Sequence, residues 1–384
     1  MRICLVSVEI FAWGKYGGFG RATRTIGREL AARGHEVFAV VPRREGQAPV
    51  EALDGMTVLS FPARRVWEAS RLFREADAEI YHSCEPSIST WLAKRAMPGR
   101  VHVVTCRDPR NFEDWKTEFL LPSRSRARVV ANWLFENGAL ARRAVRRADA
   151  VYTAARCLVP KATAIYGLAT PPRFLPTPIA MPARVDKSAR PLVCFVGRFD
   201  RRKQPERFLD LAARFPELDF IAAGASNDPH YDAQLRARYR GQPNLDLRGF
   251  VDQFRSDELS RLLGASWIQV NTSAREGLPN AMLEAAAHRC AILSTVDPDD
   301  FASCFGRRVY NDDFAAGLAW LLEKDRWRER GEAGRAHVEA TFAAGPAIEA
   351  HLAEYRRLLE GGAPARRAAI GASGSAESAA RHSG

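Results

Sequence analysis

Two glutamates eight positions apart, Glu276 and Glu284, form the pattern that most clearly indicates chemistry in this chain. Ser266–Asn271 predicts a buried strand, and Asn280–His288 predicts a helix. Glu276 therefore lies in the turn between them, and Glu284 lies about one turn inside the helix. Free N–H groups and the helix dipole favour anions there, so two carboxylates are out of place unless they hold a group rich in hydroxyls. A sugar and a ribose would fit.

A second candidate cluster is cationic. Arg198 and Lys203 follow the predicted strand Leu192–Gly197 in a basic turn. An arginine fork and a lysine ammonium at a strand end could neutralise the charge that grows on a departing diphosphate. The alternative is that they are two surface cations among the 57 Lys and Arg residues of the chain. Their position after a Val-Gly pair, with Arg198 directly behind it and Lys203 five residues further on, favours a functional role.

The third candidate is a glycine-rich loop at 15–21, between the predicted strand Ile3–Ser7 and the predicted helix Arg21–Arg33. Gly17 and Gly18 have no Cβ, so their backbone N–H groups could approach a phosphate or an acceptor closely. An ordinary strand-to-helix turn explains the same residues, and the local sequence leaves both interpretations open.

The elements that must position these residues alternate between strand and helix in two blocks. The first block has predicted strands at Ile3–Ser7, Glu36–Val41, Thr57–Phe61, Glu79–Ser83, Val101–Thr105 and Ala150–Thr153. The second has predicted strands at Leu192–Gly197, Asp219–Ala223, Leu245–Arg248, Ser266–Asn271 and Ala291–Ser294. This alternation predicts the α/β class, with two doubly wound Rossmann-like domains facing a cleft.

Composition sets the domain boundaries that we expect. The predicted order is a first domain at 1–175, a proline-rich linker at 176–190, a second domain at 191–343, a closing helix at 344–360 and a disordered tail at 361–384. A chain of 384 residues is too long for a single core, which agrees with two domains.

The cysteines and the hydropathy of the chain indicate in which cellular compartment the protein is expected. The seven cysteines include no Cys-x-x-Cys pair and lie mostly in apolar runs, which indicates buried thiols rather than a disulfide framework or a zinc site. No stretch reaches the roughly 20 apolar residues of a membrane span, and Met1–Val8 is typical of a strand rather than of a signal peptide. We expect a cytoplasmic protein.

The net charge of +12 is concentrated in the first half of the chain. Residues 1–180 contain 28 Lys/Arg and 17 Asp/Glu, whereas residues 181–384 contain 29 and 28. This asymmetry indicates either an acidic partner of the first half or arginines that simply face water, and composition leaves both open. Nucleic acid is not expected, because no binding motif is present and few aromatic residues interleave with the basic runs.

Taken in order along the chain, these pieces resemble the retaining glycosyltransferases of family 4, which have the two-domain GT-B architecture. The resemblance spans roughly residues 1–360 and rests on three motifs. They are the glycine cluster at 17–21, the Val-Gly-Arg run at 196–198 with Lys203, and the Glu276/Glu284 pair with seven residues between.

The resemblance implies roles for the site residues. Glu276 would bind hydroxyls of the donor sugar and Glu284 the ribose hydroxyls of the nucleotide, although a helix-start carboxylate and an exposed helix glutamate remain the alternatives. The backbone of the segment that follows Glu276 would face the phosphates; its residues are Gly277, Leu278, Pro279 and Asn280.

The resemblance also implies a reaction. The acceptor hydroxyl would attack a hexose-type sugar on the face from which the diphosphate leaves, and the leaving phosphate would accept the proton. The nucleotide-diphosphate sugar would be a co-substrate, and neither a metal nor another cofactor would be needed. The acceptor would be a glycan or a lipid-linked molecule.

Two positions depart from the family pattern or need comment. Arg107 occupies the place after Val101–Thr105 where the family usually has a histidine, and a permanent cation could grip a phosphate but could not carry a proton at neutral pH. Together with the segment 288–291, which lacks the family's usual glycine and proline, this departure keeps open a second hypothesis, a non-catalytic nucleotide-sugar-binding module that acts as a partner subunit. His82 ends the fourth predicted strand, where it is a candidate for substrate binding or equally a buried core histidine.

Two stretches combine arginines with aromatic residues. They are 110–147, with a predicted helix at Asn132–Arg147, and Pro62–Glu75. Such stretches could lie on the anionic inner face of a membrane and meet a lipid-linked acceptor. The alternative, which we favour, is helices whose apolar side packs on the sheet while the arginines face water.

Overall fold

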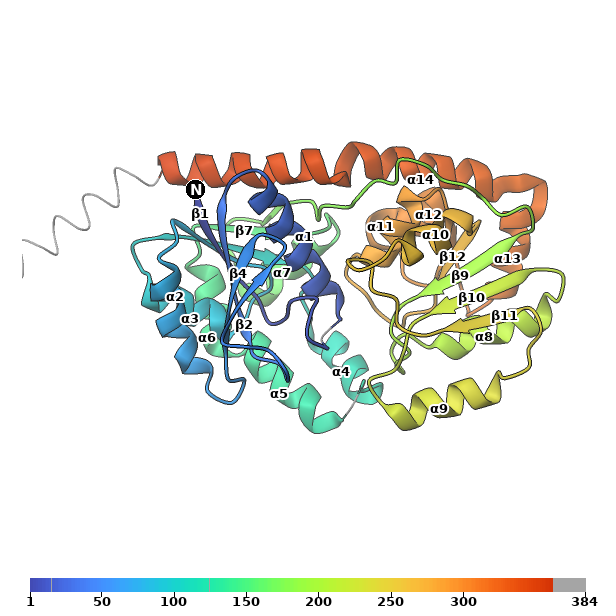
Figure 1. The fold of residues 1–384 in the computed structure, drawn as a ribbon, viewed down its shortest axis with the longest axis horizontal. Helices are drawn as coiled ribbons and strands as arrows, with labels where there is room; N and C mark the ends of the chain where they lie inside the picture. The colour runs from blue at the N-terminus through green and yellow to red at the C-terminus, as the bar shows by residue number, and fades with distance from the viewer. Residues whose placement is uncertain (15, 124, 362–384) are drawn as a thin grey trace, which may run out of the picture. The chain divides into compact units, whose positions relative to one another are not determined.

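The computed structural model describes residues 1–14, 16–123 and 125–361, drawn in colour in Figure 1. Residue contacts divide the chain into two compact units. The first comprises Met1–Cys106, Glu136–Tyr152 and the chain from Ile348 onward, and the second comprises Arg107–Phe135 and Thr153–Ala347. All but the first residue of the predicted tail at 361–384 lies outside the described residues.

The first sheet has eight strands in the order β3-β4-β2-β1-β5-β6-β7-β8. The strands are β1 (Arg2–Val6), β2 (Glu36–Pro42), β3 (Val50–Leu53), β4 (Met56–Phe61), β5 (Ile80–Ser83), β6 (Val101–Cys106), β7 (Ala150–Thr153) and β8 (Arg173–Phe174). β1 lies between β2 and β5 and pairs in parallel with both. Its apolar residues are buried on both faces, which is typical of a central parallel strand.

The hairpin formed by β3 and β4 was not predicted. Val50 pairs with Leu59 in an antiparallel register, and the two-residue turn consists of Asp54 (φ 49°) and Gly55 (φ 81°). Asp-Gly is the dipeptide that favours such a left-handed hairpin turn, so a local signal was present. The strand itself was missed because it is short and has little buried apolar surface.

Helices cover the first sheet. They include α1 (Gly18–Ala32), η1 (Val66–Glu68), α2 (Ala69–Ala76), α3 (Ile88–Ala96) and α6 (Ala139–Arg146), with further helical residues at 344–361. Apolar residues of β1, β2, β4 and β5 pack with α2 and α3 into one buried cluster that contains Phe73 and Tyr81. α1 begins three residues before the predicted start at Arg21, so the predicted loop at 15–21 is shorter than expected.

The second sheet has six strands in the order β11-β10-β9-β12-β13-β14, and all recorded pairings are parallel. The strands are β9 (Leu192–Val196), β10 (Asp219–Ala223), β11 (Leu245–Arg248), β12 (Ile268–Asn271), β13 (Ala291–Ser294) and β14 (Gly306–Arg308). Five of these match predicted strands closely, and the three-residue β14 was not predicted.

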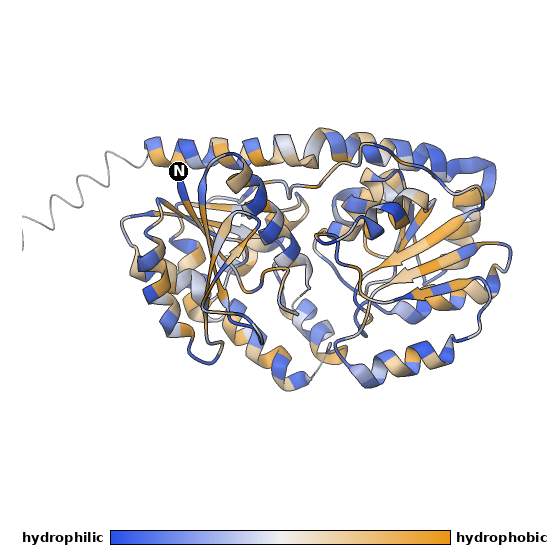
Figure 2. Cartoon of the chain, in the orientation of Figure 1, coloured by the Kyte–Doolittle hydropathy of each residue, from blue (hydrophilic) through white to orange (hydrophobic). Residues whose placement is uncertain are grey.

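Alternate residues of this sheet enter two separate cores, one on each face. Phe195 of β9 and Phe220 of β10 belong to one core, whereas their neighbours Cys194 and Ile221 belong to the other. Strands whose side chains are buried on both faces read as continuous apolar runs, and β9 and β10 are accordingly orange in Figure 2. The prediction of two α/β domains, each built on a largely parallel sheet, is confirmed.

Helices pack on both faces of the second sheet. The remaining helices are α4 (Phe112–Leu120), α5 (Arg126–Asn137), α7 (Leu158–Tyr166), α8 (Pro205–Arg214), α9 (Pro229–Arg238), α10 (Glu258–Ala265), α11 (Asn280–Ala287), η2 (Pro298–Asp300), α12 (Phe301–Phe305), α13 (Phe314–Leu322), η3 (Glu323–Asp325) and α14 (Arg326–Phe342). The first core holds residues of α8, α9 and α13, and the second holds residues of α10, α11, α12 and α14.

The single helix predicted at Asn132–Arg147 is wrong. α5 ends at Asn137, and α6 begins at Ala139 after Gly138, whose backbone is extended (φ −67°, ψ 167°). Glycine favours this break because it loses more backbone conformational entropy in a helix than any other residue. No helix in the described part of the chain is long and apolar enough to cross a membrane.

Candidate active site

The carboxyl ends of β9 and β12 carry most of the predicted site residues. The two strands are neighbours in the second sheet and run in parallel. Their ends therefore lie at the same edge of the sheet, where ligands of open α/β sheets bind. The turn 197–203 follows β9, and the loop 272–279 leads from β12 into α11.

Contacts across this edge join three of the predicted residues. Lys203 Nζ forms an ion pair with Glu276 Oε1. Arg198 Nη2 lies 3.4 Å from Asp200 Oδ2, and the backbone N–H of Lys203 donates to the other oxygen of Asp200 at 3.0 Å. The Glu276 side chain is 13% exposed and that of Arg198 is 32% exposed. Arg198 therefore keeps a solvent-facing positive charge beside a mostly covered carboxylate.

Glu276 is held as a carboxylate. Burial by itself would raise its pKa, but the charges of Lys203 and Arg202 outweigh that effect and lower the pKa to about 2. Arg202 Nη1 lies 3.6 Å from Glu276 Oε1. At neutral pH the side chain can accept hydrogen bonds from hydroxyl groups and cannot serve as a proton donor.

We expect Glu276→Gln to make the free energy of unfolding less dependent on pH in the acidic range. The pKa of Glu276 is lower in the folded protein than in the unfolded chain. Such a glutamate stabilises the folded state at pH values above its unfolded pKa, and this stabilisation is lost as the pH falls through the folded pKa. A lowering from 4.5 to about 2 corresponds to about 3 kcal/mol of stability, lost between those two pH values. Urea unfolding of both proteins from pH 7 to pH 2.5 measures this difference. If the free energy of unfolding depends on pH in the same way in wild type and variant, the lowered pKa of Glu276 is wrong.

A buried ion cluster that the sequence analysis missed supports this edge. Arg275, the residue before Glu276, contacts the carboxylates of Asp108, Asp114 (3.2 Å) and Glu118 (2.9 Å). Its side chain is 8% exposed. Arg202 joins the cluster, because its Nε lies 3.4 Å from Glu118 and its Nη1 donates to the carbonyl oxygen of Arg275 at 3.2 Å.

Asp108 is also ionised in this cluster. Burial would raise the pKa of its carboxyl group, but the positive charges of Arg275 and Arg110 lower it well below the usual range. The only local signal in the sequence was the spacing of Asp114 and Glu118, four residues apart and therefore on one side of a helix. Nothing local indicated that their partner would be Arg275, more than 150 positions away.

Glu284 lies on the less buried side of α11. Its neighbours Leu283 and Ala285 are in the core, whereas Glu284 is half-buried and accepts a hydrogen bond from Gln253 Nε2 at 3.3 Å. Different contacts therefore position Glu284 and Glu276. Glu284 keeps a partly accessible carboxylate one turn inside α11, as the spacing predicted.

The segment 277–280 forms the start of α11. Pro279 is extended and precedes the first helical residue, Asn280, while Leu278 is half-buried. A Cβ on Gly277 would lie 2.5 Å from the carbonyl oxygen of Arg107, so only glycine allows this close approach. The Arg107 guanidinium is buried and donates to Thr177 Oγ1 at 2.6 Å. The structure thus brings Arg107 and Gly277 together through the backbone.

The glycine cluster of the first unit surrounds a buried carboxylate. Glu9 Oε1 accepts a hydrogen bond from the backbone N–H of Gly20 at 2.9 Å, so an acidic side chain lies at the start of α1. A Cβ on Gly17 would lie 2.0 Å from the same oxygen, whereas a Cβ on Gly18 would meet nothing within 4 Å. Gly17 therefore has a packing role, and Gly18 has open space beside it.

We expect Gly17→Ala and Gly18→Ala to differ sharply. The first substitution must displace Glu9 and should lower the Tm, whereas the second should leave the Tm unchanged or raise it slightly, because alanine restricts the unfolded chain. Thermal unfolding of both variants tests this difference. If Gly18→Ala keeps its stability and loses transferase activity, Gly18 contacts a substrate. Equal destabilisation by the two substitutions would contradict the packing account.

His82 is a fully buried residue of the first unit. Its Nε2 lies 2.7 Å from Thr105 Oγ1, and its Nδ1 lies 2.5 Å from the hydroxyl oxygen of Tyr355. Its ring also lies 5.6 Å from that of His351, measured between ring centroids. This environment favours the core-histidine alternative over substrate binding, because no part of the side chain reaches solvent.

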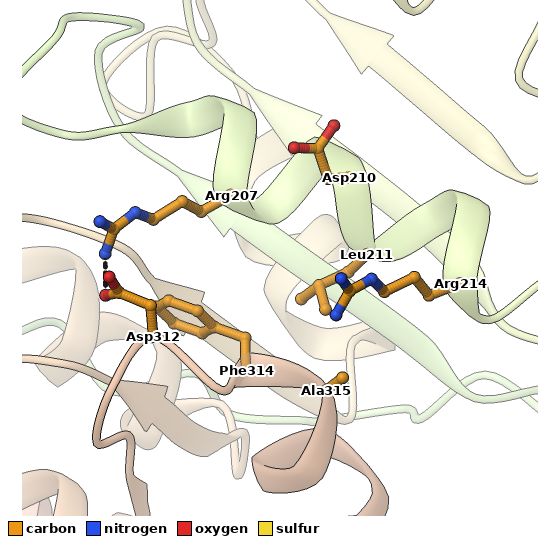
Figure 3. A pocket seen from close by; sticks show the side chains of 7 residues that line it. All are labelled: Arg207, Asp210, Leu211, Arg214, Asp312, Phe314 and Ala315. Carbon is orange, nitrogen blue, oxygen red and sulfur yellow. Dashed lines mark hydrogen bonds and ion pairs between the residues drawn. The ribbon is translucent and has the colours of Figure 1, made fainter.

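A small hollow elsewhere in the second unit is not this site. It has a volume of about 150 Å³ and is lined by residues of α8 and of the segment around Asp312 (Figure 3). An ion pair between Arg207 and Asp312 crosses its rim. Ligand pockets for drug-sized molecules usually exceed about 300 Å³, so the hollow is too small for a nucleotide sugar.

Comparison with protein families settles the family. A model described as "Glycosyl transferase 4-like domain" matches residues 17–178, and one described as "Glycosyl transferases group 1" matches residues 190–323. The two matches follow each other and together cover well over half of the chain. The chain belongs to the glycosyltransferases of family 4. The predicted family and the enzyme class are therefore confirmed.

Solved structures show the same fold. Sucrose-phosphate synthase from Thermosynechococcus elongatus is 18% identical, with a TM-score of 0.70 over 94% of this chain and 99% of that one. Anabaena Alr3699/HepE in complex with UDP-glucose is 13% identical, with a TM-score of 0.69 over 94% and 99%. WaaG, a glycosyltransferase involved in lipopolysaccharide biosynthesis, is 18% identical, with a TM-score of 0.64 over 90% and 97%. A search of curated proteins found no match.

In this family 4 glycosyltransferase, both units thus have the α/β build of the GT-B fold. Among residues 1–14, 16–123 and 125–361, no group of three or more His, Cys, Asp or Glu residues is arranged to hold a metal ion. The second unit carries Arg198, Lys203, Glu276 and Glu284 at the ends of its strands and on α11, and the first carries Gly17, Gly18 and His82.

Proposed function

We propose that this glycosyltransferase transfers a hexose-type sugar, with retention of anomeric configuration, from a nucleotide-diphosphate sugar to an acceptor hydroxyl. The observation that carries the proposal is the charged edge of the second sheet. There, Arg198 and Lys203 follow β9 directly beside Glu276, which follows β12. Cations beside an ionised carboxylate suit a ligand that is anionic at one end and rich in hydroxyls at the other.

Each side chain then has a role that follows from its environment. The partly exposed Arg198 would contact the diphosphate, and Lys203, which is already oriented by Glu276, would add a second positive charge. Glu276 would accept hydrogen bonds from sugar hydroxyls, and Glu284 from the ribose. The backbone N–H groups at the start of α11 favour the phosphates.

The reaction needs one bond exchange and one proton transfer. The bond between the anomeric carbon and the diphosphate oxygen breaks, and the acceptor oxygen bonds to that carbon on the same face. The acceptor proton moves to an oxygen of the leaving diphosphate. Arg107 cannot accept this proton at neutral pH, because a guanidinium stays protonated. Arg198 and Lys203 stabilise the departing charge, so the proposal needs neither a metal ion nor another cofactor.

A screen of nucleotide sugars by thermal shift tests the donor site. UDP-sugars come first, because a structural neighbour is a complex with UDP-glucose, and GDP-, ADP- and TDP-sugars follow. A donor at 100 times its Kd would stabilise the protein by about 2.7 kcal/mol. Arg198→Ala and Glu284→Ala should abolish the shift. If no nucleotide sugar shifts a well-folded sample, the proposed donor site is wrong.

A transfer assay tests the chemistry. With the donor identified, NMR of the product should show the anomeric configuration of the donor, in EDTA as well as in buffer. An inverted product would contradict retention, and loss of activity in EDTA that Mg²⁺ restores would contradict metal independence. Binding of the donor without any turnover would instead support the non-catalytic module, which family membership disfavours.

We further propose a cytoplasmic location and an acceptor that is a glycan or a lipid-linked molecule. The basic first half of the chain supports an anionic acceptor or an anionic surface that carries one. Competition between lipid-linked and free glycan acceptors in the transfer assay distinguishes the two.

A further inference from the structure

The helix α5 exposes an apolar side to solvent. None of its 12 residues is buried. Leu134 is 54% exposed and Trp133 45% exposed, and Val130 is similarly open. A helix of this length is marginal in water unless its apolar side packs against something. Figure 2 shows the mixture of apolar and polar residues along it.

The apolar residues of α5 lie on one side of the helix. Val129, Val130, Trp133 and Leu134 are spaced by one, three and four positions, which places them together on a helix surface; we call these four residues the α5 face. α4 adds to the exposed apolar surface with Phe119 and Leu120. The Arg126 guanidinium lies 5.3 Å from the centre of the Phe119 ring, so the two helices meet at this point.

The charge around the α5 face is mainly positive. Residues 119–137 contain three arginines and a single glutamate, Glu136, and Arg126 and Arg128 are exposed. A partner that covers this surface must therefore offer apolar contact together with negative charge. An anionic lipid bilayer offers both, and tryptophan, phenylalanine and arginine are the residues that favour its interface. We infer that the α5 face binds an anionic membrane surface.

A second copy of the chain fits this surface less well. A two-fold contact through the α5 face would bring the arginines of both copies together, and the one carboxylate of α5, Glu136, offsets only part of their charge. The other stretches that the sequence analysis considered differ from α5. α2 buries Leu72 and Phe73, and α6 buries Ala144 and Val145, so both pack as ordinary surface helices.

This inference deepens the proposed function, because a lipid-linked acceptor would be presented at such a surface. It can be tested without donor or acceptor. The full chain is floated with vesicles of 30% phosphatidylglycerol in phosphatidylcholine and with vesicles of phosphatidylcholine alone. Failure of this binding leaves the donor screen unaffected, and failure of the donor screen leaves the vesicle result unaffected.

The variants localise the contact. We expect wild type to bind the anionic vesicles and Trp133→Glu/Leu134→Glu to bind at least tenfold more weakly. The matched control Tyr310→Glu, at a residue 63% exposed elsewhere on the second unit, should bind like wild type. Arg126→Gln/Arg128→Gln should lose the preference for anionic over neutral vesicles. All variants should melt like wild type, since the substituted side chains are exposed.

Three results would overturn the inference. The first is the absence of wild-type binding, and the second is equal binding by wild type and Trp133→Glu/Leu134→Glu. The third is a dimer of the wild type, seen by light scattering without lipid, that the same double substitution dissociates, because a second copy would then cover the α5 face.

Discussion

Arg198→Ala should lower kcat/KM for sugar transfer by about 10²–10³-fold while leaving the Tm almost unchanged. The Arg198 side chain is 32% exposed and has a 3.4 Å contact with Asp200, so its removal costs little packing. In the proposed reaction it stabilises the charge of the leaving diphosphate, and that charge is largest in the transition state. The loss should therefore appear mainly in kcat.

Arg201→Ala is the matched control for this prediction. Arg201 lies three positions along the same turn, is exposed, and pairs with Asp228 at 3.6 Å rather than with the residues at the site. It carries the same charge, so a general electrostatic effect would reduce activity in both variants. Steady-state kinetics with the identified donor separate the two. Equal losses, or full activity of Arg198→Ala, would remove Arg198 from the mechanism.

Arg275→Met should cause the largest loss of stability. The substitution leaves Asp108, Asp114 and Glu118 mostly buried without their shared cation. Breaking a buried ion pair from one side costs about 3–5 kcal/mol. Lys161 stays 2.8 Å from Asp114, and Arg202 stays 3.4 Å from Glu118, so we expect the lower end, about 3 kcal/mol.

Calorimetric unfolding at several pH values tests the prediction for Arg275→Met. A loss of about 3 kcal/mol lowers the Tm by about 6–12 °C for a domain of about 150–250 residues. In the wild type, the lowered pKa of Asp108 contributes stability above its unfolded pKa, and this contribution is lost as the pH falls through the folded pKa. Without Arg275 much of that contribution is absent, so the difference between wild type and variant should shrink as the pH falls below about 4. Arg275→Lys should recover part of the lost stability. Lysine restores the positive charge, but it lacks the planar guanidinium with which arginine can contact several carboxylates. A deficit independent of pH would indicate lost packing rather than lost pairing.

Much of the fold could be predicted because its signals are local. Parallel strands buried on both faces are short apolar runs in the sequence, and β10 and β13 have the predicted bounds. The less buried β7 and the edge strand β11 have the predicted bounds as well. The strands that were missed, β3, β8 and β14, are short and partly exposed, so hydropathy does not mark them. Gly138 ends α5 within a stretch that otherwise favours a helix, and a periodic pattern does not show such a break.

The sequence by itself determined which side chains follow the strands β9 and β12, and hence that Arg198, Lys203 and Glu276 lie at the same edge of the sheet. This follows from the strand period and from the parallel order that α/β alternation imposes. That β9 and β12 are neighbours came from the structure. Only the tertiary structure decided which charges neutralise one another and which surfaces are covered. Arg275 reaches carboxylates distant in sequence, Glu9 lies against the glycine cluster, His82 is enclosed and the α5 face is open. Burial and pairing depend on what packs against a residue, and distant segments supply those neighbours.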